Sequence, residues 1–260
     1  MLSSPREIAG EIVRLCSNLR RSKTNRIQFR SNMWKLERLL LNDRLSQSAQ
    51  DEIIALKEIK RDLPALRSYY EKFETDLEYD FTREFLKKES PSIRGYALYK
   101  RFVVLVRNEA RLANISGRDC VLFIGSGPLP ITAILLHELT GCRVDCYDSN
   151  KRAAEISIDV LKQLGRSRAI RVHNRSGESL GSNSYSAIVI ALLAKPKDGI
   201  LRAVWKNSRK GARIICRTSD GIRQVFYEQT DPHLFDQYGQ AGKVYAKGDQ
   251  TISSVLLVGE

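Results

Sequence analysis

The chain has 260 residues, of which 42% are hydrophobic and 28% charged, as in a globular protein large enough to bury a core. No apolar run approaches the ~20 residues that a bilayer span requires, and the N-terminus lacks the apolar core of a secretory signal. The net charge of +13 is not gathered into a basic tract with interleaved aromatics, so we expect neither a membrane nor a nucleic-acid partner. Five cysteines without metal-ligand spacing argue against a zinc site and indicate a reduced, cytoplasmic protein.

Apolar residues recur at helical spacing through the first part of the chain, without a convincing strand. Ser46 and Ser90 are suitable N-caps, and Pro91 suits a first helical position. The predicted helices cover 4–19, 25–41, 46–63, 66–88 and 91–113. We therefore expect a helical domain over residues 1–117.

From residue 118 strand and helix patterns alternate, which predicts a doubly wound α/β, Rossmann-like domain over 118–260. Strands are expected at 119–125, 142–148, 168–173, 186–192 and 211–217, and helices at 128–140, 150–164 and 196–209. A final antiparallel hairpin is expected from 243–247 and 251–258.

The most informative segment is the apolar run Val121–Ile124, which ends in Gly125-Ser-Gly127 before a helix pattern that starts at Pro128. This strand–turn–helix unit brings backbone N–H groups against a nucleotide-like ligand. Asp148 ends the second strand, where an acidic side chain accepts hydrogen bonds from a ribose diol. A dinucleotide fingerprint requires a third glycine where Pro130 stands, so the phosphate-free adenosine of S-adenosylmethionine (SAM) fits better. The C-terminal hairpin also favours a SAM-dependent transferase, with NAD or a degenerate site as alternatives.

We expect the cofactor to contact the glycine turn and the ends of the neighbouring strands. The predicted cofactor-binding residues are Gly125, Ser126, Gly127, Pro128, Leu129, Asp148, Ser149, Asn174, Ala191 and Leu192.

The motif Gly125-Ser-Gly-Pro-Leu-Pro130 resembles the signature of nicotianamine synthases and of their bacterial relatives, which act in opine-type metallophore biosynthesis of the staphylopine, pseudopaline and yersinopine kind. Three further stretches agree in order: 94–102 with 107–110, then 191–197, then 217–227. The resemblance covers residues 70 to 258.

The resemblance implies that SAM serves as a substrate. Its 2-aminobutanoate arm passes to the amine of an acceptor, and methylthioadenosine is released. In the bacterial branch the acceptor is histidine, here expected as L-histidine in a pocket between the helical domain and the sheet, and the product passes to an opine dehydrogenase. The short tail after the last strand favours this single-transfer branch; whether the chain forms a homodimer stays open.

The transfer requires a base, because only a deprotonated amine has a lone pair, and a carboxylate shielded from water can serve. The resemblance places the catalytic glutamate of the family at Glu78, with Glu74, Asp80 and Glu84 as alternatives. A tyrosine that partners this glutamate in archaeal relatives falls on Phe102. Tyr99, as a catalytic residue, and Tyr96, as a substrate-binding residue, are expected to substitute for it, although core packing is an alternative for both.

Glu78, Glu109, Arg217 and Asp220 complete the predicted substrate-binding set. Arg217 follows the fifth strand, where a buried arginine can clamp a carboxylate, and a structural ion pair is the alternative for Arg217 and for Glu109. No metal site is expected, because the three histidines share no ligand spacing.

Three other functions stay open at this point. A SAM-dependent methyltransferase of a small molecule or RNA is the main alternative, although an Asn/Asp-Pro-Pro-Tyr motif is absent after the fourth strand. The others are a nicotianamine synthase proper and a non-catalytic basic module that binds nucleic acid.

Overall fold

A computed structural model describes residues 4–41, 45–89, 91–182 and 184–259. The chain forms two compact units. The first, called the helical unit, comprises Met1–Glu74, Thr218–Gln229 and Tyr245–Ser253; the second, called the sheet unit, comprises Thr75–Arg217, Thr230–Val244 and Ser254–Glu260.

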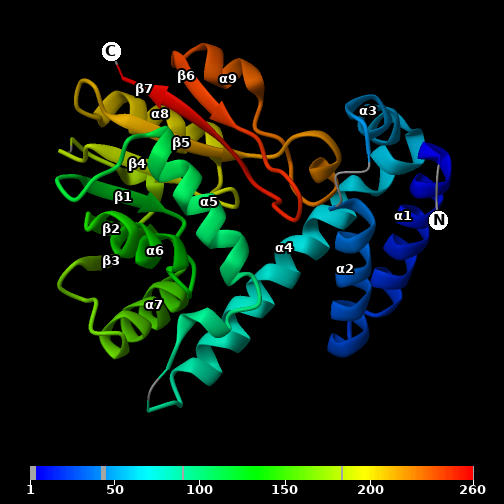
Figure 1. The fold of residues 1–260 in the computed structure, drawn as a ribbon, viewed down its shortest axis with the longest axis horizontal. Coiled ribbons are helices and arrows are strands. Elements are labelled where there is room, and N and C mark those ends of the chain that lie inside the picture. Colours follow the sequence, from blue (N-terminus) through cyan, green and yellow to red (C-terminus); the bar gives the residue numbers. More distant parts are fainter. Residues whose placement is uncertain (1–3, 42–44, 90, 183, 260) are drawn as a thin grey trace. The chain divides into compact units, whose positions relative to one another are not determined.

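The helical unit contains α1 (Pro5–Arg21), α2 (Arg26–Leu40), α3 (Gln47–Ala55), the first part of α4 (Lys57–Phe85) and η3 (Gly221–Val225) (Figure 1). Side-chain caps explain where three of these helices begin. Ser4 forms a capping box with Glu7, while Asn25 and Ser46 each accept a hydrogen bond from a backbone N–H of the first turn. The cap expected at Ser46 is therefore confirmed.

The expected break between the third and fourth helices is wrong in position. The structure breaks the helix at Leu56, whose backbone is extended, and α4 then runs through Pro64. Proline removes one helical hydrogen bond, but Leu63 and Leu66 on either side are buried and hold the helix together by packing.

The helix expected over 91–113 is also shorter than predicted. A 3₁₀ turn, η1 (Ile93–Gly95), precedes α5 (Tyr99–Leu112). Ser92 caps that short turn, which ends before Tyr96 in extended conformation. The cap expected at Ser90 lies outside the described residues.

The sheet unit is built on a seven-stranded sheet of order β3-β2-β1-β4-β5-β7-β6. Its strands are β1 (Cys120–Ile124), β2 (Arg143–Asp148), β3 (Ile170–Asn174), β4 (Ala187–Ile190), β5 (Arg213–Thr218), β6 (Gln240–Val244) and β7 (Ser253–Val258). The first five are parallel, and β6 pairs antiparallel with β7. The predicted α/β class and hairpin are confirmed, although the hairpin strands lie at 240–244 and 253–258 instead of 243–247 and 251–258.

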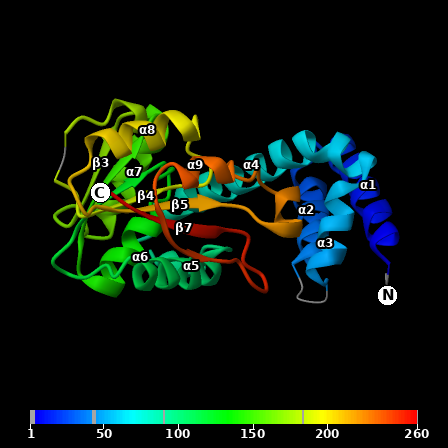
Figure 2. The ribbon, with the colours of Figure 1, turned by 90° about the horizontal axis from the view of Figure 1, so that it is seen from above.

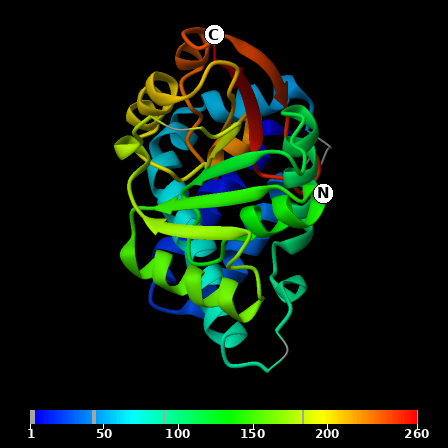
Figure 3. The ribbon, with the colours of Figure 1, turned by 90° about the vertical axis from the view of Figure 1, so that its left-hand side faces the viewer.

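Helices cover both faces of this sheet. The helices of the sheet unit that follow α5 are α6 (Ile131–Thr140), α7 (Lys151–Gln163), α8 (Lys197–Asn207), α9 (Pro232–Asp236) and the 3₁₀ turn η2 (Gly177–Ser179). Figure 2 shows α5 and α6 on one face of the strands and α8 on the other. Figure 3 shows the same layers from the side, with yellow α8 and green α6 separated by the strands.

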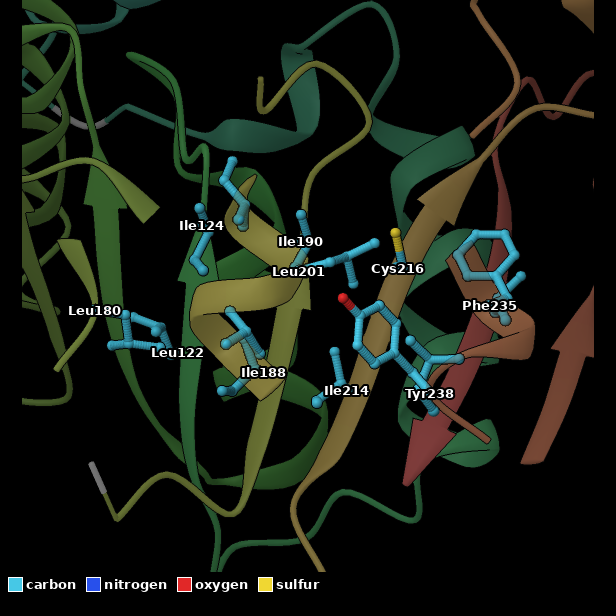
Figure 4. Close-up of a cluster of buried hydrophobic side chains, with 14 of the residues drawn as sticks. Leu122, Ile124, Leu180, Ile188, Ile190, Leu201, Ile214, Cys216, Phe235 and Tyr238 are labelled. Atoms are coloured by element: carbon cyan, nitrogen blue, oxygen red, sulfur yellow. The ribbon is translucent and has the colours of Figure 1, made fainter. Parts of the chain in front are cut away.

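The core under α8 is apolar. Leu122, Ile188 and Ile214 on three adjacent strands are fully buried against Leu201 of α8, and Phe235 of α9 closes the cluster (Figure 4). Burial of this face holds the carboxyl ends of β1, β4 and β5 in register.

The compact units divide within α4, whereas the sequence suggests a boundary at residue 117. α5, expected in the helical domain, packs on α6 and belongs to the sheet unit. The division into domains 1–117 and 118–260 stays a prediction. Among the described residues, no helix is both long and apolar enough to cross a bilayer.

Candidate functional site

The turn after β1 depends on two glycines in the left-handed region, Gly125 with φ +84° and Gly127 with φ +67°. Other residues adopt this conformation only with strain. A β-carbon at Gly125 would also lie 3.1 Å from the β-carbons of Ala191 and Ala194, which follow β4. The turn therefore packs closely against the segment that leaves β4.

Most N–H groups of this turn are already used or missing. Gly125 donates to the carbonyl of Tyr147 over 2.7 Å, and Ile131, the first residue of α6, donates to the carbonyl of Leu129 over 2.7 Å. Pro128 and Pro130 have no N–H. The sequence places the helix start at Pro128, which is wrong: Pro130 is the N-cap of α6, and Pro128 and Leu129 are buried in the turn.

Asp148 ties the turn to β2. Its Oδ2 accepts a hydrogen bond from the N–H of Gly127 over 2.7 Å, and its Oδ1 accepts one from the N–H of Asn150 over 2.9 Å. The Asn174 side chain donates to the carbonyls of Asp148 and Ser149 over 3.0 and 3.1 Å. The carboxylate of Asp148 thus ties the turn after β1 to the end of β2, and Asn174 ties the end of β3 to the same segment.

Ser126 lies between the two glycines and is 4% exposed. Within the described part of the chain, its buried Oγ has no hydrogen-bond partner. A buried hydroxyl without a partner is costly, so this atom suits a polar group of a bound ligand.

Glu78 reaches the same turn from α4. A β-carbon at Gly127 would lie 2.6 Å from Oε2 of Glu78, so the carboxylate lies directly against the glycine. Both residues belong to the sheet unit. The structure therefore brings together the predicted base and the predicted cofactor turn.

Tyr79, which the sequence reasoning missed, lies beside this carboxylate cluster. Burial raises the pKa of its hydroxyl, the Arg152 charge opposes this shift, and the negative charges of Asp148 and Glu78 add to it. The Arg152 guanidinium carbon lies 5.6 Å from the centre of the Tyr79 ring. Only its place next to Glu78 in the sequence signals this position.

The end of β4 supplies the other side of the turn. Ala191 and Leu192 are buried, and the N–H of Ala191 donates to the carbonyl of Ile124 over 2.9 Å. The Lys197 ammonium donates to the carbonyl of Ala191, and burial lowers the pKa of Lys197 to about 8. Lys197 belongs to the 191–197 motif, but the sequence does not predict this hydrogen bond or the lowered pKa.

Arg217 and Glu109 form a buried ion pair, with side chains 3% and 0% exposed. Two of the guanidinium nitrogens contact the two carboxylate oxygens over 2.9 Å each, one of them also donates to Thr132, and Ser254 donates to Glu109 over 2.7 Å. The pair links α5, α6, β5 and β7. This geometry agrees with the structural alternative for both residues, and their substrate-binding roles stay a prediction.

Two predicted tyrosines lie near the start of α5. Tyr96 is 3% exposed, and its ring centre lies 5.4 Å from that of Phe81 and 6.4 Å from that of Phe102. This aromatic packing is typical of a core position. Tyr99 is the first residue of α5 and is partly exposed, and its catalytic role stays a prediction.

Asp220 lies in the helical unit, so its predicted contact with a substrate stays a prediction. Within the ranges that the structure describes, no group of three or more histidine, cysteine, aspartate or glutamate side chains is arranged to hold a metal ion.

Comparison with known proteins supports the family resemblance that the sequence motifs indicate. The family model described as nicotianamine synthase protein matches residues 10–259. L-histidine 2-aminobutanoyltransferase of Yersinia pestis is 26% identical over 137 residues, or 53% of this chain and 51% of that protein. Nicotianamine synthase 2 of Oryza sativa subsp. japonica is 29% identical over 149 residues, or 53% of this chain and 45% of that protein. The chain thus spans about half the length of these curated relatives.

Solved structures extend the likeness over the whole fold. A crystal structure of an MtNAS mutant in complex with S-adenosylmethionine has a TM-score of 0.89 and 26% identity, over 96% of this chain and 97% of that one. A structure of MtNAS in complex with MTA and tNA has a TM-score of 0.90 and 25% identity over the same shares. This likeness confirms the predicted transferase-type fold. By its sequence and its fold, the chain belongs to the nicotianamine synthase family.

Proposed function

We propose that this protein transfers the 2-aminobutanoate moiety of SAM to the amine of an amino acid and releases methylthioadenosine. The observation that carries the proposal is the contact between the Glu78 carboxylate and Gly127 of the turn between β1 and α6, residues 125–130, which we call the nucleoside turn. In this proposal the carboxylate takes the proton of an acceptor amine that is held near the sulfonium of SAM.

The turn between β1 and α6 is the proposed adenosine site. Asp148 accepts two backbone N–H bonds and keeps further lone pairs for the ribose diol, and the Ser126 hydroxyl supplies a second polar contact. The structures of an MtNAS mutant with S-adenosylmethionine and of MtNAS with MTA and tNA support a nucleoside of this class as the ligand. The proposed contacts include Leu192 and Ala191 at the end of β4.

In the reaction, the acceptor nitrogen attacks the arm carbon that is bonded to the sulfonium. The new C–N bond forms as the C–S bond breaks, and the electron pair of that bond stays on sulfur in methylthioadenosine. The proton lost by the acceptor amine passes to Glu78. Since all three carbons on a sulfonium are electrophilic, the position of the nucleophile selects the arm over the methyl group.

We propose L-histidine as the acceptor and a single transfer per turnover. Support comes from the L-histidine 2-aminobutanoyltransferases among the relatives, at 26% identity over half of the chain. A nicotianamine synthase, which would use a second aminobutanoate arm, is the competing candidate, because rice synthases are 29% identical over a similar share. We further propose that the product passes to an opine dehydrogenase in the cytoplasm.

The identity of the released nucleoside tests the reaction class. The protein is incubated with SAM and L-histidine, and the products are separated by mass. Methylthioadenosine together with histidine heavier by one aminobutanoate is the expected result. S-adenosylhomocysteine would instead identify a methyltransferase, and no nucleoside would contradict the proposal. Omitting histidine while supplying excess SAM tests for nicotianamine synthase activity.

A further inference from the structure

Lys197 is the first residue of α8, which begins beyond the carboxyl end of β4. Its ammonium donates to the carbonyl of Ala191, the residue that packs against Gly125 of the nucleoside turn. The residue keeps partial exposure. A lysine head group therefore lies at the end of the sheet where parallel α/β folds bind ligands.

The surroundings of this ammonium do not supply a counter-charge. The charged groups facing it are Arg217 on β5 and Lys195 in the preceding segment, both of which oppose its positive charge; the Cys216 thiol on β5 is the titratable group that favours it. Arg217 is itself held by Glu109. Across residues 4–41, 45–89, 91–182 and 184–259, no carboxylate pairs with Lys197.

A cation that is largely removed from water is normally paired, because one carbonyl oxygen does not replace its hydration. The burial that lowers the pKa of Lys197 to about 8 reflects this missing partner. Arg217, near the carboxyl end of β5, is paired with the carboxylate of Glu109. Lys197, beyond the carboxyl end of β4, has no such carboxylate among the described residues. The difference points to a counter-ion that arrives with a ligand.

We propose that the Lys197 ammonium binds the α-carboxylate of an amino-acid ligand. The inference rests on the proposed function, in which two such carboxylates enter the site: that of SAM and that of the acceptor. Lys197 lies outside the nucleoside turn and is distinct from the proposed base, Glu78. Lysine provides a point charge with three donors, one of which is already committed to Ala191.

Four ligands separate the two sources of the carboxylate. SAM and methylthioadenosine share the nucleoside but only SAM has the carboxylate, and L-histidine and histamine differ in the same way. Calorimetry measures the affinity of each ligand, the last two on protein saturated with methylthioadenosine. Lys197→Met keeps most of the length of the side chain and removes the charge. Lys206→Met is the matched control, since Lys206 is exposed on the same helix.

Lys197→Met is expected to bind one carboxylate ligand about 10- to 100-fold more weakly, the effect of one charge-assisted hydrogen bond, while the counterpart without the carboxylate binds as in the wild type. Loss of affinity for SAM assigns the donor carboxylate, and loss for histidine assigns the acceptor carboxylate. Equal losses for SAM and methylthioadenosine, or no loss for either carboxylate ligand, would overturn the inference. Wild-type protein that binds no nucleoside would instead overturn the proposed function, and the inference with it.

A second measurement does not depend on a variant that folds. When a carboxylate pairs with Lys197, the ammonium form is stabilised, so the wild-type protein takes up protons on binding near pH 8 and much less at pH 6.5. Calorimetry in two buffers of different ionisation enthalpy measures this uptake. Uptake with the carboxylate ligand but not with methylthioadenosine is expected; the same proton balance for both would contradict the assignment.

Discussion

The carboxylate of Glu78 lies directly against the α-carbon of Gly127, so closely that a β-carbon there would be 2.6 Å from Oε2. This position needs glycine for two reasons, because its φ of +67° also belongs to the left-handed region. The contact places the proposed base at the edge of the proposed nucleoside site. Two of the predictions below follow from it.

Gly127→Ala should displace the Glu78 side chain and lower both SAM affinity and turnover. Gly165→Ala is the matched control, because Gly165 has φ +66° but nothing within 4 Å of an added β-carbon. Both variants should lose about 1–2 kcal/mol of stability from the left-handed backbone, measured by urea unfolding. Only Gly127→Ala should lose activity as well; equal activity of the two variants would show that the contact with Glu78 is unimportant.

Glu78→Gln keeps the shape of the side chain and removes its ability to accept a proton. The single-turnover rate should fall about 10²–10⁴-fold, while SAM binding persists. The wild-type rate should decline in acid as the base is protonated, and the variant should lack that decline. Glu58→Gln, an exposed change on the same helix, is the control. Normal turnover of Glu78→Gln with inactive Asp80 variants would reassign the base.

Asp148→Ala removes the partner of the Gly127 N–H as well as the expected partner of the ribose. We expect SAM and methylthioadenosine to lose about 1–3 kcal/mol of binding free energy equally, because they share the ribose. Asp159→Ala, on exposed α7 surface, controls for the change in net charge. Calorimetry that finds unchanged affinity for both nucleosides would rule out this ribose site.

The Glu109–Arg217 pair should act on stability, not on substrate binding. Glu109→Gln or Arg217→Met alone leaves an uncompensated buried charge and should cost about 3–5 kcal/mol of unfolding free energy. The double variant should recover part of this loss, because it removes both charges. Single variants that unfold like the wild type but raise KM for the acceptor would restore the substrate-binding role.

Lys197 should leave a signature in the pH dependence of stability. Its pKa is about 8 in the folded protein against the ordinary value of 10.5 for lysine, so above pH 8 the unfolded chain binds more protons than the folded one. Stability of the wild type relative to Lys197→Met should therefore rise by up to about 1.4 kcal/mol per pH unit between pH 8 and 9. A constant difference between the two proteins over pH 7–9 would contradict this.

The sequence predicts the alternating strands and the glycine turn well, because buried parallel strands and left-handed glycines have local signatures. The ends of the helices are more difficult to predict from the sequence. The local sequence does not show that α4 continues through Pro64, because packing of the neighbouring leucines decides this. It also does not show that α6 begins only at Ile131, because the proline-containing turn sets that start.

The partners of long-range polar groups were the least predictable part of the site. Arg217 and Glu109 are 108 residues apart, and only the sheet brings them together. The family resemblance, not the local pattern, predicts the position of Glu78. The sequence does not predict the buried surroundings of Lys197, because Cys216 and Arg217 of β5 form part of them. Such contacts depend on topology, which local periodicity does not report.

The two prolines of the turn have a consequence for competing nucleotides. With Pro128 and Pro130 lacking N–H groups, and those of Gly125, Gly127 and Ile131 already bonded within the protein, this turn has fewer backbone donors for a phosphate than a turn without prolines. ATP and NAD carry the same adenosine as SAM but need those donors. We expect them to bind this turn more weakly than SAM, so that phosphorylated relatives of the substrate compete less for the site.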